Sequence, residues 1–298
     1  MTIGFNGQVA IVTGAGRGLG RSHAELLAER GATVVVNDVV GADEVEAAIN
    51  RAGGRAVASD DDISTPAGAA SLVQRTAEEF GGVQILINNA GVGRFTTLDL
   101  ASIDEYELVR RSGLDGTFYV TREVWPLMTA AKYGRIVVTT SGNGLLGNPA
   151  SVTYAIAKAG VYGLMRAVAL DGAEFGIKAN ALAPMASTPM STEFVSPDMA
   201  EMLRVEFPTS LVSPIVAVLA SEQCPVSGYT FDAGGGRIGI TFQGTNAGFY
   251  DRDMTPESIL SSWDSVVSRA DFVEFASGYE SLSMVAASRE RALVGIGE

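Results

Sequence analysis

Histidine and cysteine are almost missing from this chain, which has one of each among its 298 residues. The single cysteine, Cys224, cannot form an internal disulfide, which favours a reducing compartment, and we predict a cytoplasmic protein. One histidine and one cysteine are too few for an ordinary zinc site, so we predict that the protein binds no metal. A Ser-His-Asp triad would need His23, which we interpret instead as a structural or surface residue of the first helix.

Positive charge is also scarce, because 21 lysines and arginines face 34 aspartates and glutamates and leave a net charge of −13. Such a chain repels phosphate backbones and anionic lipids, so we expect no nucleic-acid partner and no membrane partner. No apolar run is long enough for a membrane helix, and we expect no targeting segment at either end. An anionic substrate would therefore have to be met by a few well-placed cations.

Apolar residues make up 47% of the chain and charged residues 18%, a balance typical of a globular protein rather than a disordered one. Short apolar runs alternate with longer helical segments, which indicates βαβ units and a parallel sheet. We predict an α/β fold with a doubly wound parallel sheet of the Rossmann type, formed by residues 1–236 as a single domain. Residues 237–298 are expected to be a C-terminal extension that wraps the domain or covers a subunit interface.

The expected elements follow from apolar periodicity and from capping residues. Strands are expected at 9–12, 32–36, 55–59, 83–87, 135–139 and 177–182, and 229–231 is expected to be the last strand. Helices are expected through 24–28, at 45–52, 65–80, 103–124 with one interruption, 153–175 and 214–220, and from 255 onward.

A glycine-rich turn follows the first expected strand. Gly14, Gly18 and Gly20 match the pattern T-G-x-x-x-G-x-G, whereas the plain fingerprint G-x-G-x-x-G is not met. Backbone N–H groups in such a turn can approach a pyrophosphate at the N-terminus of the next helix, where the helix dipole helps. We therefore expect this turn, which also contains Arg17 and Leu19, to bind a dinucleotide cofactor.

Asp38 comes just after the second expected strand and bears on the choice of cofactor. A carboxylate at this place can accept hydrogen bonds from the adenosine ribose and would repel a 2′-phosphate, so we predict NAD rather than NADP. Arg17 is a contrary signal, because a cation in the turn could pair with that phosphate. The alternative is that Asp38 is only a solvated residue at the end of a strand.

Tyr154 and Lys158 are four positions apart in an expected helix and so share one face. Ser141 lies upstream at the end of an expected strand, at the sheet edge where ligands bind. A free tyrosine has a pKa near ~10, and a nearby ammonium together with a cationic nicotinamide would lower it. Tyr154 could then accept the proton of an alcohol while Ser141 holds the reacting oxygen. The alternative is an ordinary surface pair.

These motifs occur in the order found in the short-chain dehydrogenase/reductase family, which the chain resembles over about residues 5–236. The match includes the glycine turn, the Ser-Tyr-Lys set, Asp62-Ile63 after the third strand and Asn88-Asn89-Ala90-Gly91 after the fourth. The resemblance implies that Asp62 and Ile63 contact the adenine and that Lys158 also binds the nicotinamide ribose. The cofactor site it implies comprises Gly14, Arg17, Gly18, Leu19, Gly20, Asp38, Asp62, Ile63, Asn89, Ala90, Gly91, Tyr154, Lys158, Pro184 and Thr188.

Further stretches of the chain are similar to one group within that family; they are 35–38, 133–136, 147–148 and 183–186, with 256–259 and 263–264 in the tail. On these stretches the chain most resembles the (3R)-hydroxyacyl-CoA dehydrogenase unit of peroxisomal multifunctional enzymes of type 2, and it is also similar to stand-alone bacterial steroid dehydrogenases. Two positions depart from the family pattern. Gly113 stands where the family has an asparagine whose main-chain carbonyl holds a water near the lysine, and a glycine keeps that carbonyl. Met185 stands where the family has the glycine of a Pro-Gly pair, which should reshape the nicotinamide pocket.

The segment 187–208 follows the sixth strand, where the family places its substrate loop, and we expect Met190 and Phe194 to contact the substrate along with Ser141 and Tyr154. A helix started by Ser196 would present an apolar face there; the alternative is a helix that packs only on the core or on another subunit. A CoA thioester would also need cations, for which we name Arg94, Arg110, Arg111 and Arg204.

Three functions remain open from the sequence. The first is an NAD-dependent dehydrogenase for a small-molecule substrate, either a 3-hydroxyacyl-CoA or a hydroxysteroid. The second is an NADPH-dependent 3-oxoacyl carrier-protein reductase, which Asp38 argues against. The third is a non-catalytic protein that senses NAD, for which Gly113 is the best support. In each case we expect a homo-dimer or a homo-tetramer.

Overall fold

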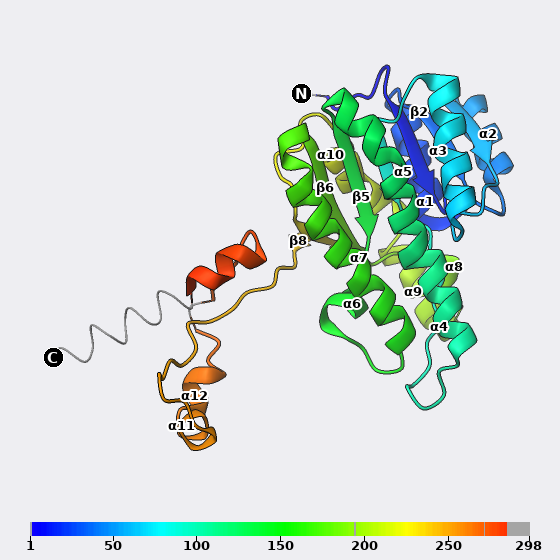
Figure 1. Cartoon of the computed structure of the whole chain (residues 1–298). Helices are drawn as coiled ribbons and strands as arrows, with labels where there is room; N and C mark the ends of the chain where they lie inside the picture. The colour runs from blue at the N-terminus through cyan, green and yellow to red at the C-terminus, as the bar shows by residue number, and fades with distance from the viewer. Residues whose placement is uncertain (1, 194, 271, 285–298) are drawn as a thin grey trace. The chain divides into compact units, whose positions relative to one another are not determined.

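The computed structural model describes residues 2–193, 195–270 and 272–284, and in them a single 8-stranded sheet has the strand order β3-β2-β1-β4-β5-β6-β7-β8 (Figure 1). All neighbouring strands pair in parallel except β7 and β8, which are antiparallel. The predicted doubly wound parallel sheet is therefore confirmed. The strands are β1 (Val9–Thr13), β2 (Thr33–Asn37), β3 (Arg55–Ser59), β4 (Ile85–Asn88), β5 (Gly134–Thr139), β6 (Ile177–Pro184), β7 (Thr230–Gly234) and β8 (Arg237–Ile240).

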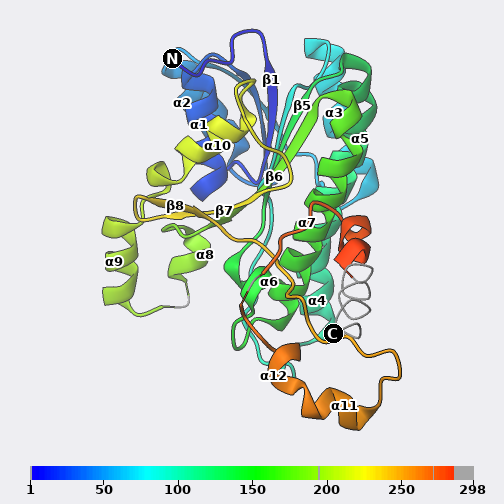
Figure 2. The same ribbon diagram turned by 90° about the vertical axis from the view of Figure 1, so that its left-hand side faces the viewer.

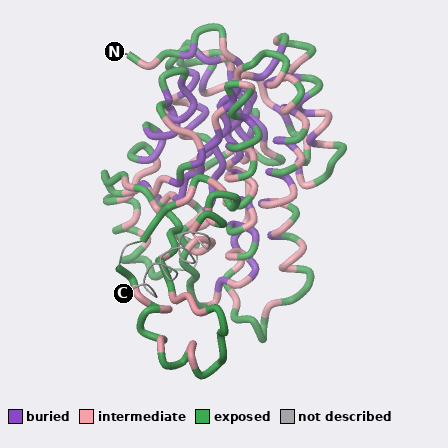
Figure 3. Tube along the Cα trace, turned by 60° about the vertical axis from the view of Figure 1, so that its left-hand side comes forward, coloured by how far each residue is buried: buried purple, intermediate pink, exposed green. Residues whose placement is uncertain are grey.

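Helices cover both faces of this sheet, because its strands carry buried apolar side chains on each side. On one face, α1 (Gly18–Glu29), α2 (Ala42–Arg51) and α10 (Ser213–Ala220) contribute to one buried apolar cluster. On the other face, α3 (Pro66–Phe80), α5 (Gly116–Ala131) and α7 (Val152–Asp171) contribute to a second cluster. Figure 3 shows buried chain concentrated along the strands and the inner sides of these helices.

The other helical segments lie in the connections. They are α4 (Ile103–Val109), the π-helical turn η1 (Arg110–Asp115), α6 (Gly142–Leu146), the 3-10 turn η2 (Ala173–Phe175), α8 (Pro189–Thr192), α9 (Pro197–Glu206), the 3-10 turn η3 (Thr209–Leu211), α11 (Pro256–Ser261) and α12 (Trp263–Val266). Figure 2 shows α8 and α9 side by side. Short helices such as α6 and α8 have too few residues for a periodic apolar pattern, and the sequence analysis did not include them.

Three predicted element ends were wrong. Residues 229–231 do not form the last strand, because Gly235 and Gly236 both have positive φ and turn the chain into β8. The helix predicted at 153–175 ends at Asp171, and Gly172 leads into η2. The interruption expected within 103–124 is η1, after which α5 continues beyond the predicted end to Ala131 with Pro126 inside it.

The chain divides into two compact units, Met1–Thr241 and a second unit that begins at Phe242. In the second unit Thr255 caps α11, and Thr245 pairs with Val273 in an isolated bridge. None of the described residues of this unit is buried. The expectation that residues 237–298 wrap the domain or cover a subunit interface stays a prediction.

Among the described residues no single helix is long and apolar enough to cross a bilayer, although the bent pair of α9 with the segment Thr209–Ala220 passes the length and composition test.

His23 is a structural residue between α1 and α10. It is 1% exposed, and its Nδ1 lies 2.8 Å from Ser213 Oγ. Burial lowers the pKa of His23 from 6.5 to about 3, because the charged ring would lose its hydration.

We expect the free energy of unfolding to fall as the pH drops below 6.5, because His23 then binds a proton in the unfolded chain and not in the folded one. The single histidine should cost about 2 kcal/mol of stability between pH 7.5 and 5. Urea denaturation at several pH values would measure this loss, and His23→Asn should show a flatter profile between the same limits. A wild-type curve as flat as that of the variant would contradict the expectation.

Candidate active site

A cavity of about 580 Å³ opens at the carboxyl ends of the parallel strands, where the strand order reverses between β1 and β4. The structure brings together almost all of the residues that the sequence analysis selected. Those that line the cavity are Gly14, Arg17, Gly18, Leu19, Asp38, Asp62, Ile63, Asn89, Ala90, Gly91, Ser141, Tyr154, Lys158, Pro184, Thr188 and Met190. Gly20 is not a lining residue, and Phe194 lies outside the described residues.

The glycine turn fits a phosphate group. Gly14 and Gly18 have φ values of 63° and 58°, a conformation that favours glycine. α1 begins at Gly18 without a side-chain cap and without an acidic residue in its first turn, so its first N–H groups can bind an anion. A Cβ on Gly14 would lie 2.7 Å from the Cα of Ala90, so only a glycine lets these two turns approach. These features together accommodate the pyrophosphate of a dinucleotide.

Two residues hold this turn in place. A Cβ on Gly20 would lie 2.2 Å from the Gly14 carbonyl oxygen, so Gly20 allows α1 to pack against the turn. The side-chain amide of Asn89 donates to the carbonyl oxygens of Thr13 and Gly14, each at 3.1 Å. The Thr13 hydroxyl accepts from the N–H groups of Asn89 and Ala90, also at 3.1 Å. Asn89 therefore lines the cavity, but its side-chain amide donates to the glycine turn. The role of the Thr13 hydroxyl in holding the turn was not predicted.

Asp38 lines the cavity, and backbone donors fix its carboxylate. The Gly16 N–H donates to its Oδ2 at 3.0 Å, and the Val40 N–H donates to its Oδ1 at 3.1 Å. Each carboxylate oxygen has further capacity to accept, so ribose hydroxyls could be bound as well. The buried side chain of Ile63 adds an apolar wall suited to a base.

Ser141, Tyr154 and Lys158 meet at the other end of the cavity. Ser141 lies just after β5 and is the N-cap of α6. It hydrogen-bonds to the phenol of Tyr154. Lys158 is buried one helical turn beyond Tyr154, and its Nζ lies 5.7 Å from the centroid of the Tyr154 ring. The ammonium donates to the Thr139 carbonyl oxygen at 2.6 Å, which fixes its position.

Burial shifts the pKa values of both Tyr154 and Lys158. It raises the pKa of the phenol, and the hydrogen bond from Ser141 only partly opposes this. Burial also lowers the pKa of Lys158 to about 8, so this ammonium is close to losing its charge near neutral pH. The lowering of the Tyr154 pKa expected from Lys158 together with a cationic nicotinamide stays a prediction for the cofactor-bound enzyme.

Gly113 lies inside the π-helical turn η1, a feature that often marks functional positions. Its carbonyl oxygen accepts from the Thr117 hydroxyl at 2.6 Å. A Cβ on Gly91 would lie 3.5 Å from Lys158 Nζ and 3.7 Å from the Cα of Gly113, so the three residues are neighbours. The carbonyl retains a second lone pair, and the expected water relay remains a prediction.

An apolar wall stands next to Tyr154. The Phe95 and Tyr154 ring centroids are 5.5 Å apart, and a Cβ on Gly93 would touch both Phe95 and the sulfur of Met190. Leu203 of α9 and the exposed Met185 also line the cavity, whereas Met199 and Met202 are not among its lining residues. Phe95 was not predicted, because it lies in a loop without a regular apolar pattern.

The four arginines proposed for an anionic substrate have different surroundings. Arg94 lines the cavity. Arg110 pairs with Asp115, Arg111 with Glu107, and Arg204 with Glu201. Within the described residues, Arg94 is the member of this set for which no carboxylate partner is found.

Comparison with known proteins places the site in a family. The family model described as short chain dehydrogenase matches residues 8–198. A short-chain type dehydrogenase/reductase of Mycobacterium tuberculosis is 38% identical over 275 residues, which cover 88% of this chain and 95% of that protein. Peroxisomal multifunctional enzyme type 2 of Mus musculus is 36% identical over 277 residues, which cover 88% of this chain and 37% of that enzyme.

Among solved structures, full-length peroxisomal multifunctional enzyme type 2 from Drosophila melanogaster superposes with a TM-score of 0.83 at 32% identity. The match covers 97% of this chain and 50% of that one. The chain therefore spans about half or less of these two multifunctional enzymes.

Proposed function

Since the chain belongs to the short-chain dehydrogenase family, we propose that it is an NAD-dependent oxidoreductase that transfers a hydride between NAD and a secondary alcohol or ketone. The family uses a nicotinamide cofactor, and the choice of NAD is our proposal. The observation that carries it is that Ser141, Tyr154 and Lys158 share one cavity with the glycine turn.

The chemistry divides between the cofactor and the chain. When bound, the nicotinamide cofactor supplies the hydride acceptor for an alcohol. Tyr154 takes the alcohol proton at its phenolate oxygen, Ser141 donates a hydrogen bond to the reacting oxygen, and Lys158 supplies positive charge beside the ring. Phe95 and Met190 give this end of the cavity an apolar surface beside Tyr154.

As substrate we propose a 3-hydroxyacyl-CoA, with a hydroxysteroid as the other small-molecule candidate. The acyl thioester is favoured by the likeness to multifunctional enzymes and by Arg94 in the cavity wall. Turnover of NAD with a panel of 3-hydroxyacyl-CoAs and hydroxysteroids would decide between the two.

The preference for NAD rests on Asp38. We expect wild-type kcat/KM to favour NAD over NADP by one to several powers of ten, or about 1.4 kcal/mol for each. Asp38→Ser should remove most of this preference, because the repulsion of a 2′-phosphate disappears and Arg17 remains nearby. Steady-state kinetics with both cofactors would measure the ratio.

Asp62→Asn is the matched control for this experiment, because Asp62 also lines the cavity and carries the same charge. It should leave the ratio within a factor of two or three of the wild type. Equal wild-type kcat/KM values for NAD and NADP would contradict the proposal and favour the NADPH-dependent 3-oxoacyl carrier-protein reductase, the candidate that Arg17 supports.

Two further proposals concern the assembly and the compartment. We propose a homo-dimer or homo-tetramer, since apolar side chains such as Leu108 and Phe118 are exposed on α4 and α5. Light scattering coupled to gel filtration would give the number of subunits. A cytoplasmic location is supported by the single, buried Cys224.

A further inference from the structure

We propose that Arg94 binds the phosphate groups of a CoA thioester and so determines which form of the acyl substrate the enzyme accepts. This inference rests on the proposed function and adds a specificity-determining residue to it. The nearest alternatives are a neutral hydroxysteroid, which has no phosphate for Arg94 to bind, and a purely structural arginine.

The position of Arg94 along the cavity wall supports this role. Arg94 Nη1 donates to the Gly93 carbonyl oxygen at 2.8 Å, which ties the guanidinium to the segment that carries the apolar wall. Phe95, the next residue, stands against Tyr154 with ring centroids 5.5 Å apart. The guanidinium and the phenol therefore belong to the same cavity, with the apolar side chain of Phe95 between them in sequence and against the phenol ring.

The surroundings of Arg94 leave its charge available. A guanidinium has five N–H donors in a planar fork that matches the oxygens of a phosphate. The Gly93 carbonyl oxygen accepts from one of them, and in the described part of the chain we find no carboxylate in an ion pair with Arg94. Arg17 in the glycine turn is the other arginine of the cavity lining that is absent from the ion pairs of the described residues.

The other cations near the cavity have different positions. Arg17 lines the cavity at the glycine turn, and Lys158 is held by the Thr139 carbonyl oxygen. Arg110, Arg111 and Arg204 each pair with a carboxylate close in sequence, and they are not among the lining residues. Among the cations that line the cavity, Arg94 is therefore the one next in sequence to the apolar wall.

The test compares two thioesters with the same 3-hydroxyacyl group, one on CoA and one on pantetheine, which lacks the phosphates. With NAD saturating, Arg94→Gln should raise KM for the CoA thioester ten- to hundredfold and leave kcat within twofold. KM for the pantetheine thioester should stay within twofold of the wild type, and Arg94→Lys should restore part of the affinity for CoA. Added salt should raise KM for the CoA thioester in the wild type and much less in Arg94→Gln.

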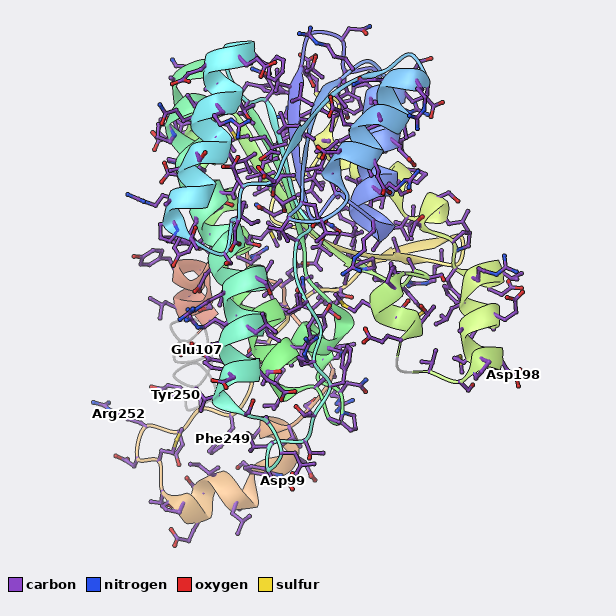
Figure 4. The ribbon with its side chains drawn as sticks, turned by 90° about the vertical axis from the view of Figure 1, so that its right-hand side faces the viewer. Asp99, Glu107, Asp198, Phe249, Tyr250 and Arg252 are labelled. Atoms are coloured by element: carbon purple, nitrogen blue, oxygen red, sulfur yellow. The ribbon has the colours of Figure 1, made fainter. Side chains whose placement is uncertain are left out.

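Arg111→Gln is the matched control, because it removes the same charge from an exposed pair with Glu107 at 3.1 Å, outside the cavity. Figure 4 labels Glu107 on α4. This variant should leave both KM values within twofold. An unchanged KM for CoA thioester in Arg94→Gln, or an equal rise for both thioesters, would overturn the inference.

A binding measurement separates this inference from the proposed function. Calorimetric titration of CoA into the NADH-saturated protein should show binding that Arg94→Gln weakens at least tenfold, whether or not alcohols are turned over. Such a loss in a protein that oxidises no alcohol would refute the proposed function and retain the inference. An active enzyme that binds CoA equally well with and without Arg94, or that does not bind CoA, would refute the inference and retain the proposed function.

Discussion

Replacing Tyr154 by phenylalanine is expected to lower kcat for alcohol oxidation by a factor of about 10²–10⁴, the usual contribution of a positioned acid-base group. The variant loses the phenolic hydroxyl, which hydrogen-bonds to Ser141. It keeps the aromatic ring, which packs on Phe95 and lies over Lys158 Nζ. Affinity for NADH should stay within a few-fold, since the glycine turn and Asp38 are untouched. Stopped-flow turnover and NADH fluorescence titration would measure the two quantities.

The same reasoning sets the pH dependence of the wild-type reaction. Because alcohol oxidation needs the phenolate and burial raises the pKa of Tyr154, kcat/KM for oxidation should increase with rising pH.

Tyr162→Phe is the matched control for Tyr154→Phe, since Tyr162 lies on the same helix, packs beside the second core cluster and does not line the cavity. A Tyr154→Phe enzyme with a sizeable fraction of the wild-type rate would refute the proton-transfer role. A protein that binds NADH and turns over no alcohol even as wild type would instead be a sensor.

Gly20→Ala should weaken cofactor binding by about two powers of ten and lower the free energy of unfolding by about 1–3 kcal/mol, the usual cost of overpacking. The new Cβ would lie 2.2 Å from the Gly14 carbonyl oxygen and 2.5 Å from Asn89 Nδ2. Either α1 or the turn must move, and the phosphate site is built from both. Fluorescence titration with NADH and urea denaturation would measure the two effects.

Gly163→Ala is the control for this variant. Gly163 is a glycine of α7 with no heavy atom within 4 Å of a built Cβ. Alanine there should stabilise the protein by up to about 1 kcal/mol, because it favours the helix. Wild-type NADH affinity in Gly20→Ala would show that the turn tolerates the side chain, contrary to the packing seen here.

Local sequence patterns accounted for most of the fold. The strand at 55–59 and the helix that begins after Thr65 were predicted at their observed ends, because the Gly53-Gly54 pair before the strand and a cap followed by proline are local signals. The strand β8 was missed although Gly235 and Gly236 signal a hairpin, since it has only four residues and one of them, Gly239, is a poor strand former.

By itself the sequence determined the parallel sheet, the family and the set of polar residues gathered at one edge of that sheet. Those conclusions depend on neighbours along the chain and on the rule that parallel strands end at the same edge. The tertiary structure decided how each residue is used. It placed Gly20 behind the turn and turned the Asn89 amide toward Gly14. Among the described residues it paired Arg111, but not Arg94, with a carboxylate. Such roles depend on contacts between segments far apart in the chain and on desolvation, and neither leaves a local pattern in the sequence.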